Sequence, residues 1–229
     1  MIPTVSIGGS GGALPTTASP WAGTPVEETF TPSFFERSAE LVAPDLLGTK
    51  LVSTVDEKRT VGVIVEVEAY VGTEDPASHA ASRIGRTRRN ETMFGRSGIA
   101  YVYLSYGVHW CLNVVTGSVG EPSAILVRAA DPLEGVDVMV ERRNRNRDLA
   151  SGPGRLGQAF GITGALNGHH LSLSPLRLLP GWFVEEDQVE VSPRIGVSRA
   201  VDWPLRFSIR GNTSVSRRSQ KPLNARGLR

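Results

Sequence analysis

The chain has 229 residues, a formal net charge of +2, 40% hydrophobic residues and a single cysteine, Cys111. This length is enough for one buried core, and no run of about 18 apolar residues occurs, so no membrane-spanning helix is predicted. A lone cysteine excludes an internal disulfide and a multi-cysteine zinc site, and the N-terminus lacks a signal-peptide pattern, which together predict a cytoplasmic protein.

Residues 1–30 consist mostly of Gly, Ser, Thr, Pro and Ala and predict a disordered leader. An ordered domain is expected to begin at residue 31, with a helix from Ser33 to Leu41 and a short helical turn at Pro44–Gly48. A strand from Leu51 to Val55 follows, and a cluster of charged residues turns the chain into the next strand.

That next strand, Val61 to Val71, carries the first candidates for chemistry. Successive side chains of a strand point to opposite faces, so one face is expected to be an apolar row. The other face is expected to carry Ile64, Glu66, Glu68 and Tyr70. Acids are depleted in strands, so two carboxylates beside a phenol indicate either a solvated face or a functional site, and the strand alone leaves both open.

Residues 72–98 form a long segment without periodicity that contains His79. A loop of this length within a domain is usually functional or disordered. Five arginines and one acid lie between Arg83 and Arg96, which favours either a polyanion partner or a solvated loop. The candidates for contacts with a nucleic-acid backbone are Arg86, Arg88 and Arg89.

A β-hairpin is predicted for Ile99–Val115, where two alternating runs flank Ser105–Val108. Tyr101 and Tyr103 would lie on one face of its first strand. Tyr106 would stand at the tip, where no core can receive it. An exposed aromatic side chain at such a tip indicates a contact surface.

A strand is predicted for Ser123–Ala130, followed by a helix that Asp131 caps and that runs to about Arg147. Ser151–Gly154 is expected to open a further helix through Phe160. The N-terminus of that helix could receive a phosphate or could simply be capped.

Three C-terminal strands, Val189–Val191, Arg194–Val197 and Leu205–Ile209, are expected to complete a sheet or barrel. No internal repeat and no domain boundary follow the leader, so residues 31–216 predict one domain. Residues 217–229 contain basic residues and no acid, and they predict a basic flexible tail.

Together these features favour chemistry on a nucleic-acid base. Aromatic rings on neighbouring strands can sandwich a flat ligand, and stacking a base on one of them contributes roughly 1–3 kcal/mol. A carboxylate beside such a slot can act as a general base toward water. Enzymes that act on a base take it out of the helix, and a wedge such as Tyr106 can fill the gap while arginines hold the backbone.

Two rival interpretations use the same residues. Glu66 and Glu68 could bind a metal ion as in nucleases, but no third acid has a metal-like spacing, so neither a metal nor a cofactor is predicted. The candidate partners of such a metal site would be Asp75, Asp131 and Asp137. The second rival is a module that binds nucleic acid and stacks bases without chemistry, which would gain nothing from a carboxylate facing a polyanion.

Five runs of sequence occur in the order VEVEAYVGTEDPASHA, RRNETMFG, YVYLSYGVHWCLNV, LVRAADPLEG and SGPGRL. In order and spacing they closely resemble the alkyladenine (3-methyladenine) DNA glycosylase family, and the resemblance covers roughly Ser38 to Ser216. It implies an α+β fold, a single mixed domain around a curved antiparallel β-sheet with surrounding helices and a protruding β-hairpin.

The resemblance also implies roles for individual residues. Glu68 matches the family's general base, and Arg128 matches the arginine beside the catalytic water. Tyr70 and Tyr103 match the aromatic residues that enclose the flipped base. The other matches are His79 at the edge of the base, Asn113 as the pocket asparagine that disfavours the guanine amino group, and Tyr106 as the intercalating residue.

The implied activity is that of a monofunctional DNA N-glycosylase, which flips out and excises alkylated or deaminated purines in base excision repair. Its partner would be double-stranded DNA with damaged purines, and the protein would act as a monomer, associated with the nucleoid if bacterial. No lysine lies in the matching runs, which argues against the Schiff base of a lyase. Val108 and His109 differ from the bulkier or aromatic residues that some relatives have beside the wedge. This difference affects how the wedge holds the DNA and contacts the opposite strand, and not the chemistry.

Overall fold

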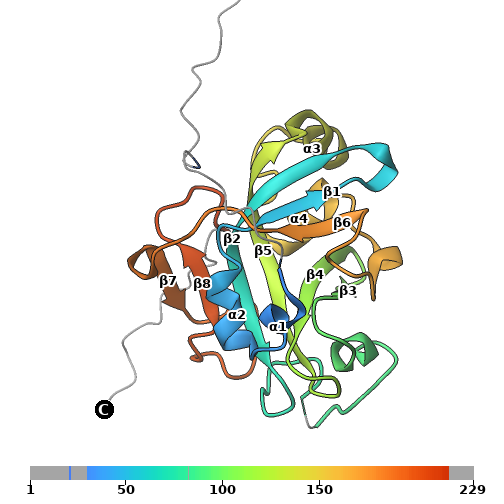
Figure 1. Cartoon of the computed structure of the whole chain (residues 1–229), viewed down its shortest axis with the longest axis vertical. Helices are drawn as coiled ribbons and strands as arrows, with labels where there is room; N and C mark the ends of the chain where they lie inside the picture. Colours follow the sequence, from blue (N-terminus) through green and yellow to red (C-terminus); the bar gives the residue numbers. More distant parts are fainter. Residues whose placement is uncertain (1–20, 22–29, 82, 217–229) are drawn as a thin grey trace, which may run out of the picture.

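Eight antiparallel strands form one curled sheet in the part of the chain that the structure, a computed structural model, describes: residue 21, residues 30–81 and residues 83–216 (Figure 1). The strand order is β3-β4-β5-β2-β1-β6, and β8 pairs with β2 and β7. Short helices surround the sheet, which confirms the predicted α+β fold. The predicted leader and tail lie outside the described residues, apart from Trp21 and Phe30.

The strands are β1 (Lys50–Ser53), β2 (Thr60–Val71), β3 (Ala100–Ser105), β4 (His109–Thr116), β5 (Ser123–Glu134), β6 (Leu176–Leu179), β7 (Val189–Ser192) and β8 (Arg206–Ile209). The α-helices are α1 (Pro32–Phe35), α2 (Ala39–Asp45), α3 (Val136–Arg143) and α4 (Pro153–Ala159). The 3-10 helices are η1 (Val55–Glu57), η2 (Glu91–Phe94), η3 (Gly164–Leu166) and η4 (Glu186–Gln188). Helix α2 packs on β2, and α4 packs on β4 and α3 (Figure 1).

The sheet divides at β2. Along one edge, β2 pairs with β5 over nearly its whole length, from Val61 to Val71. Along its other edge, β2 pairs first with β1, through residues 60–63, and then with β8, through residues 66–68. Residues 66–68 of β2 therefore lie between β5 and β8, where they are shielded on both edges.

Three register shifts interrupt the pairing of β2 with β5, and the two near the middle of β2 are β-bulges beside Glu66. The register runs through the pairs Ile64–Ala130, Glu66–Ala129 and Val67–Val127. Val65 is therefore an extra residue on β2, and Arg128 is an extra residue on β5. Bulges re-aim side chains and are common next to active sites. The bulge on β5 thus releases Arg128 from the ladder at the level of the β2 glutamates.

The bulge at Val65 also changes which residues of β2 share a face. Ile64 belongs to the same apolar cluster as Val67 and Ala69, although a regular strand would place it opposite them. The predicted alternation is therefore wrong at this point. Both glutamates of β2 are 0% exposed, so the interpretation of a solvated face is wrong as well.

The apolar core lies between the sheet and helices α2 and α4. Helix α2 contributes Ala39, Val42 and Ala43, and the ring of Phe160 at the end of α4 is fully buried. Gly62 of β2 lies against this ring, because a Cβ atom at this position would be 2.9 Å from Cζ of Phe160. Burying each large apolar side chain stabilises the fold by about 1.5–3 kcal/mol, so this contact holds β2 firmly against α4.

The helical region before β1 differs from the predicted helix over Ser33–Leu41. Helix α1 ends at Phe35 and α2 begins at Ala39, because Ser38 has an extended backbone (φ −62°, ψ 152°) that cannot continue a helix. The helical turn predicted to start at Pro44 is instead the end of α2. Burial of the apolar face of α2 offsets the backbone hydrogen bond that proline lacks.

The predicted helix cap at Asp131 is wrong, because β5 continues through this residue. The carboxylate of Asp131 accepts hydrogen bonds from Ser214 Oγ (2.7 Å) and Trp21 Nε1 (3.0 Å), so it is not available to cap a helix. Gly135, with a φ of 66°, makes the turn from β5 into α3. Helix α3 is accordingly shorter than the predicted helix to Arg147.

The strands predicted at Val189–Val191 and Leu205–Ile209 correspond to β7 and β8, whereas Arg194–Val197 is not a strand. The backbone N–H of Ile195 donates to the side chain of Glu68 and not to a neighbouring strand. Strand β6, which pairs with β1, has no counterpart among the predicted elements, because it has only four residues and lies between Pro175 and Pro180. No helix among the described residues is long and apolar enough to cross a membrane.

Candidate active site

A cavity of about 580 Å³ opens beside strands β2 to β5. This volume lies within the range of ligand pockets, roughly 300–1,000 Å³. The predicted site residues at its wall are Tyr70, His79, Arg89, Tyr103, Tyr106, Asn113 and Arg128. Glu68 lies behind this wall and is bonded to three residues that form it. Of the predicted site residues, Arg86 and Arg88 are not part of the wall.

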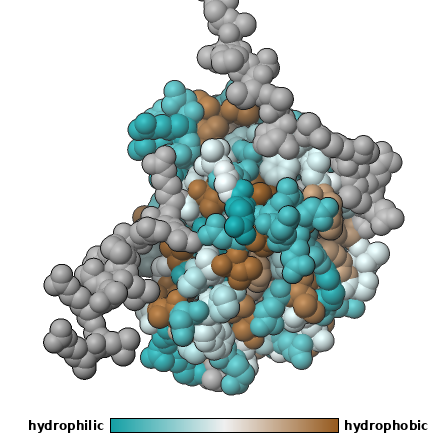
Figure 2. Space-filling model, turned by 90° about the vertical axis from the view of Figure 1, so that its left-hand side faces the viewer, coloured by the Kyte–Doolittle hydropathy of each residue, from teal (hydrophilic) through white to brown (hydrophobic). Residues whose placement is uncertain are grey.

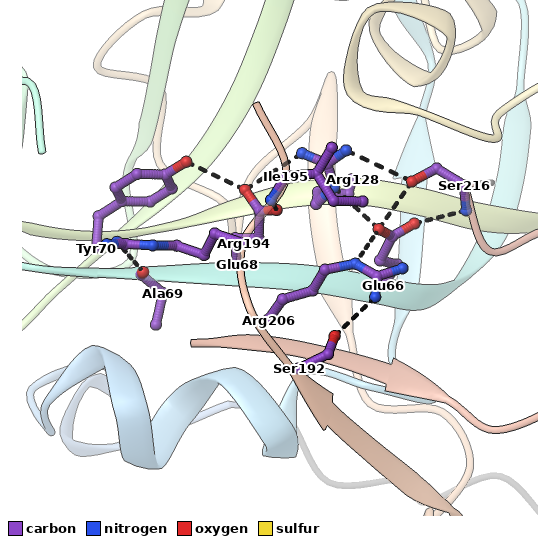
Figure 3. Close-up of polar contacts among 10 residues, drawn as sticks. All are labelled: Glu66, Glu68, Ala69, Tyr70, Arg128, Ser192, Arg194, Ile195, Arg206 and Ser216. Atoms are coloured by element: carbon purple, nitrogen blue, oxygen red, sulfur yellow. Dashed lines mark hydrogen bonds and ion pairs between the residues drawn. The ribbon is translucent and has the colours of Figure 1, made fainter. Parts of the chain in front are cut away.

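Glu68 is fully buried, and both of its carboxylate oxygens are bonded (Figure 3). Oε1 accepts a hydrogen bond from the backbone N–H of Ile195 at 2.7 Å. Oε2 accepts one from the Tyr70 hydroxyl at 3.1 Å and lies 3.2 Å from Nη1 of Arg128. Three groups thus fix the orientation of this carboxylate at the cavity wall.

Glu66 holds Arg128 from the other side (Figure 3). Its Oε1 accepts hydrogen bonds from Nε of Arg128 (2.9 Å) and Nε of Arg206 (2.7 Å). The hydroxyl and the backbone N–H of Ser216 donate to Oε1 (2.8 Å) and Oε2 (2.6 Å), respectively. Arg128 is therefore clamped between two carboxylates, and its guanidinium cannot turn away from Glu68.

The two glutamates differ in their affinity for a proton. Burial raises the pKa of Glu68 above its ordinary value, although Arg128 and the Ile195 N–H oppose it. Burial also acts to raise the pKa of Glu66, but Arg128 and Arg206 outweigh it, so the pKa of Glu66 is lowered. A raised pKa makes Glu68 the better proton acceptor of the pair, as a general base requires.

Three rings form another part of the wall. Nδ1 of His79 lies 3.0 Å from the hydroxyl of Tyr101, and the rings of His79 and Tyr103 meet edge to face at 4.5 Å between centroids. Burial, and then the charge of Arg89, lower the pKa of His79, which keeps this ring neutral near pH 7. Burial raises the pKa of Tyr101 to about 12. Uncharged aromatic rings suit a flat ligand that binds by stacking.

Asn113 and Cys111 lie opposite Tyr101 and Tyr103 in the register of β4 with β3. The side-chain amide of Asn113 donates to the carbonyl oxygen of Tyr101 at 3.0 Å, which fixes the orientation of the amide at the wall. Cys111 is a free, buried thiol that also lines the cavity. The predicted hairpin is confirmed, with these four residues on the cavity face.

Tyr106 is 91% exposed at the tip of the β3–β4 hairpin. Tyr106 and Gly107 both have positive φ (49° and 72°), and Val108 N–H donates to the Ser105 carbonyl at 3.0 Å. Ser105 pairs with His109, so the loop has three residues, and Tyr106 and Gly107 are the central residues of its hydrogen-bonded turn. Positive φ is uncommon for tyrosine, so the tip combines a backbone strain with an exposed ring, as contact residues often do.

The loop between β2 and β3 presents the predicted DNA-contacting arginines on the surface. Arg86, Arg88 and Arg89 are all exposed. Arg86 forms an ion pair with Glu91 (3.0 Å), and Arg89 donates to the Leu104 carbonyl at 3.2 Å. Arg89 is thereby held against β3 of the hairpin and Arg86 against η2, both on the surface, where a phosphate backbone could reach them.

Among the described residues, no group of three or more His, Cys, Asp and Glu side chains could hold a metal ion. Asp75, a candidate metal partner from the sequence, is bound to Arg194 instead. A second cavity of about 900 Å³ lies beside α1, α2, β7 and β8, with Asp45 and Glu186 as its charged lining residues.

This second cavity contains no predicted site residue. Figure 2 shows the side of the molecule that bears β7 and β8, where apolar side chains form separate patches among hydrophilic ones. Acid–base chemistry is concentrated at the first cavity, which we therefore take as the candidate active site.

Four residues of this site have no role in the sequence interpretation: Arg194, Ile195, Arg206 and Ser216. They come from the segments after β7 and around β8, far from β2 in sequence. Ile195 acts through its backbone N–H, which no side-chain pattern reveals. Arg206 gave no distinctive signal either, because Arg206 and Ser208 alternate with apolar residues as in any half-buried strand.

A family model described as Methylpurine-DNA glycosylase (MPG) matches residues 33–213. Relatives named "Putative 3-methyladenine DNA glycosylase" are similar over most of their length. The one from Rhodopseudomonas palustris (strain BisB18) is 48% identical over 187 residues, which cover 81% of this chain and 89% of the relative. That from Methanoculleus marisnigri is 48% identical over 196 residues, covering 83% and 100%. That from Myxococcus xanthus is 46% identical over 188 residues, covering 81% and 92%.

Proposed function

Because the chain belongs to the methylpurine-DNA glycosylase family, and is therefore a hydrolase of N-glycosyl bonds, we propose that it excises alkylated or deaminated purines flipped out of duplex DNA. Water replaces the base at C1′ of the sugar, and an abasic site remains. The reaction is monofunctional, because the nucleophile is water and not an amine of the protein.

In this mechanism Glu68 accepts a proton from a water molecule. That water is held at the part of the cavity wall that Tyr70, Arg128 and Ile195 form around Glu68. The water oxygen bonds to C1′ as the N-glycosidic bond breaks, and the base leaves with the bonding electrons. A purine that already carries an alkyl group and a positive charge leaves as a neutral base. Such a leaving group needs little acid assistance, so one general base suffices.

The observation that carries this proposal is the burial of Glu68 directly behind a cavity lined by aromatic rings. Burying a carboxylate costs free energy, and Arg128 and Ile195 hold it at that cavity instead of leaving it solvated. A module that only stacks bases gains nothing from this arrangement. A hydrolase gains an oriented base with a raised pKa.

The remaining site residues would bind the substrate. We assign Tyr70, Tyr103 and His79 to the walls around the flipped base, and Asn113 to discrimination against the guanine amino group. Tyr106 would fill the gap in the duplex. The DNA backbone would be held by the exposed arginines Arg86, Arg88 and Arg89.

The partner in this proposal is double-stranded DNA that contains a damaged purine. One chain supplies the general base, the aromatic walls and the wedge, so we propose that the protein acts as a monomer. An enzyme with this substrate works where the genome lies, which corresponds to the cytoplasm, and to the nucleoid if the source is bacterial.

Replacing the proposed general base, Glu68, tests the mechanism. Glu68→Gln should abolish release of the purine while affinity for the lesion duplex survives, because the change keeps the size of the side chain and removes its basicity. Glu134→Gln, which alters an exposed glutamate paired with Arg59, should keep the wild-type rate. Single-turnover excision by Glu68→Gln at the wild-type rate would overturn the assignment.

The substrate is tested with duplexes that each contain one lesion: 3-methyladenine, 7-methylguanine, hypoxanthine or ethenoadenine. Alkali-labile sites are scored with and without excess EDTA, and release is expected to be insensitive to the chelator. Binding without release from any lesion would favour the base-stacking module. Activity that EDTA removes and added Mg²⁺ or Zn²⁺ restores would favour a metal-dependent enzyme.

A further inference from the structure

Arg194 does not line the cavity, yet it contacts the chain around Glu68. It lies between β7 and β8, and its side chain is fully buried. Nη1 and Nη2 donate to the two carboxylate oxygens of Asp75, with 2.8 Å between Nη2 and Oδ1. A buried arginine bonded in this two-point manner has a fixed position and direction, which a lysine could not reproduce.

The same guanidinium reaches β2 (Figure 3). Nη1 of Arg194 donates at 2.9 Å to the carbonyl oxygen of Ala69, the residue between Glu68 and Tyr70. The guanidinium carbon lies 4.7 Å from the centre of the Tyr70 ring, which is a cation–π distance. Strand β8 begins opposite Glu68, so beyond this point Arg194 supplies the hydrogen bond that a strand would give to Ala69.

Asp75 carries this arrangement into the loop that follows β2. Its carboxylate also accepts hydrogen bonds from the backbone N–H groups of Val71 (3.3 Å) and Ala77 (3.0 Å). The start of the loop that leads to His79 is therefore tied to Arg194 through one carboxylate. A change in this pair would move two walls of the cavity together.

Ile195 connects Arg194 to the carboxylate of Glu68. It follows Arg194 directly, and its N–H is the donor to Oε1 of Glu68. Fixing the side chain of Arg194 on Asp75 and Ala69 also fixes the direction in which this N–H points. Neighbouring residues 195–198 line the cavity.

We propose that Arg194, clamped by Asp75, is a positioning residue that holds the ring of Tyr70 and directs the Ile195 N–H to Glu68. The proposal rests on the proposed role of Glu68 as the general base. Without the clamp, the hydrogen bond to Oε1 weakens, and the carboxylate both loses its orientation and accepts a proton more readily. Excision should then slow most at low pH, where protonated Glu68 cannot act as a base.

Several charged and titratable groups surround Glu68, and they determine which variant is informative. They are Glu66 and Tyr70 on β2, Tyr103 on β3, Arg128 on β5, Arg206 on β8 and Arg194 itself. A neutral residue at position 194 would remove a positive charge as well as the clamp. Arg194→Lys keeps the charge but loses the planar two-point contact and the stacking on Tyr70, so it isolates positioning from charge.

The test compares Arg194→Lys with the wild type and with Arg142→Lys. Arg142 also donates to two backbone carbonyls, those of Val55 (2.8 Å) and Ala159 (3.2 Å), but it does not line the cavity. Three quantities are measured: the single-turnover excision rate against pH, the NMR titration of the Glu68 carboxyl carbon in the free protein, and the melting temperature.

Arg194→Lys is expected to slow excision roughly ten- to a hundred-fold, because small displacements of a catalytic group have effects of this size. The acidic limb of its pH–rate profile and the titration of the Glu68 carboxyl group should both move to higher pH. Arg142→Lys should lower the melting temperature without moving the acidic limb or the Glu68 titration. A purely structural role for Arg194 predicts the same behaviour as the Arg142 variant.

A folded Arg194→Lys variant with an unmoved acidic limb and an unmoved Glu68 titration would overturn the proposal. If that variant does not fold, Asp75→Asn keeps the arginine and weakens the pair; the lost negative charge acts to lower the Glu68 pKa, so a Glu68 titration that still moves to higher pH supports positioning, and one that is unmoved or moves to lower pH overturns it. A wild type that releases no base, but whose Glu68 titration still responds to the Arg194 change, would contradict the proposed function and leave the positioning role intact.

Discussion

At the scale of single residues, the site depends on how many arginines pair with each glutamate of β2. Glu66 has two arginines and the two donors of Ser216, whereas Glu68 shares Arg128 and otherwise accepts from uncharged donors. Both side chains are 0% exposed. The difference in charged partners therefore helps to separate a carboxylate whose pKa is lowered from one whose pKa burial raises.

The two glutamates should consequently affect folding stability with opposite dependence on pH. The lowered pKa of Glu66 means that its contribution is present above the unfolded-state pKa and is lost as the pH falls through the folded-state value. Glu66→Gln should therefore destabilise the protein at neutral pH, by about 3–5 kcal/mol for a broken buried pair, and less in acid.

The raised pKa of Glu68 has the reverse effect, because its contribution is full below the unfolded-state pKa and is lost as the pH rises through the folded-state value. Glu68→Gln should gain stability relative to the wild type as the pH rises. Denaturant unfolding of both variants at several pH values measures this. Parallel pH dependence of the two differences would contradict the assignment.

The residue types of the site are accessible from sequence, but its hydrogen-bond donors are not. Glu68 stands out because acids are depleted in strands, whereas Tyr70 and Tyr103 are ordinary strand residues that gain meaning only beside it and from the family resemblance. The N–H groups of Ile195 and Ser216 reach Glu68 and Glu66 only through the tertiary fold. Every residue has such a group, so nothing in the sequence distinguishes these two.

At the scale of elements, the proposed wedge role of the β3–β4 hairpin can be tested separately from DNA binding. If the Tyr106 ring repays part of the unstacking free energy, Tyr106→Ser should slow excision from a lesion duplex by one to a few orders of magnitude, each factor of ten being about 1.4 kcal/mol. Affinity for undamaged duplex should change little, because in this proposal the arginines supply most of it. Single-turnover rates are compared with duplex affinity at two salt concentrations.

Val119→Ser is the matched control for this change, because Val119 is also exposed (70%) and lies in the turn between β4 and β5. It should leave both quantities near the wild type. If the Tyr106 variant lost duplex affinity in proportion to its rate, the ring would be an ordinary contact residue and not a wedge.

Elements with local signals were predictable, and elements set by long-range pairing were not. The hairpin was found because two alternating runs flank a turn with Gly107. The bulges at Val65 and Arg128 depend on how β2 and β5 meet, which neither strand encodes alone. Asp131 carries the local signal of a helix cap, but pairing with β2 and bonds from distant side chains override it.

At the scale of the whole molecule, the distribution of lysines predicts the type of product. Lys50 and Lys58 are the lysines among the described residues, and neither lines the cavity. Lys58 pairs with Glu141 at 2.8 Å, and Lys50 lies 5.8 Å from the ring of Trp182. No described lysine amine is thus placed to form a Schiff base at the abasic site.

Borohydride should therefore trap no covalent complex between the enzyme and a lesion duplex, and the product strand should stay intact until alkali is added. A lyase-active glycosylase run in parallel serves as the positive control. A trapped complex of this enzyme would show that an amine of the chain reaches C1′ and that the reaction is not monofunctional.

The extra residue at Val65 makes the length of β2 as important as its composition. The bulge absorbs this residue, so Ile64 shares a face with Val67 and Ala69 while the two glutamates stay on the other face. One further residue inserted after Val67, with no bulge to absorb it, would turn the rest of the strand over. In genetic terms, a substitution in β2 alters one group of the site, whereas such a single-codon insertion would move Glu68 and Tyr70 to the opposite face together.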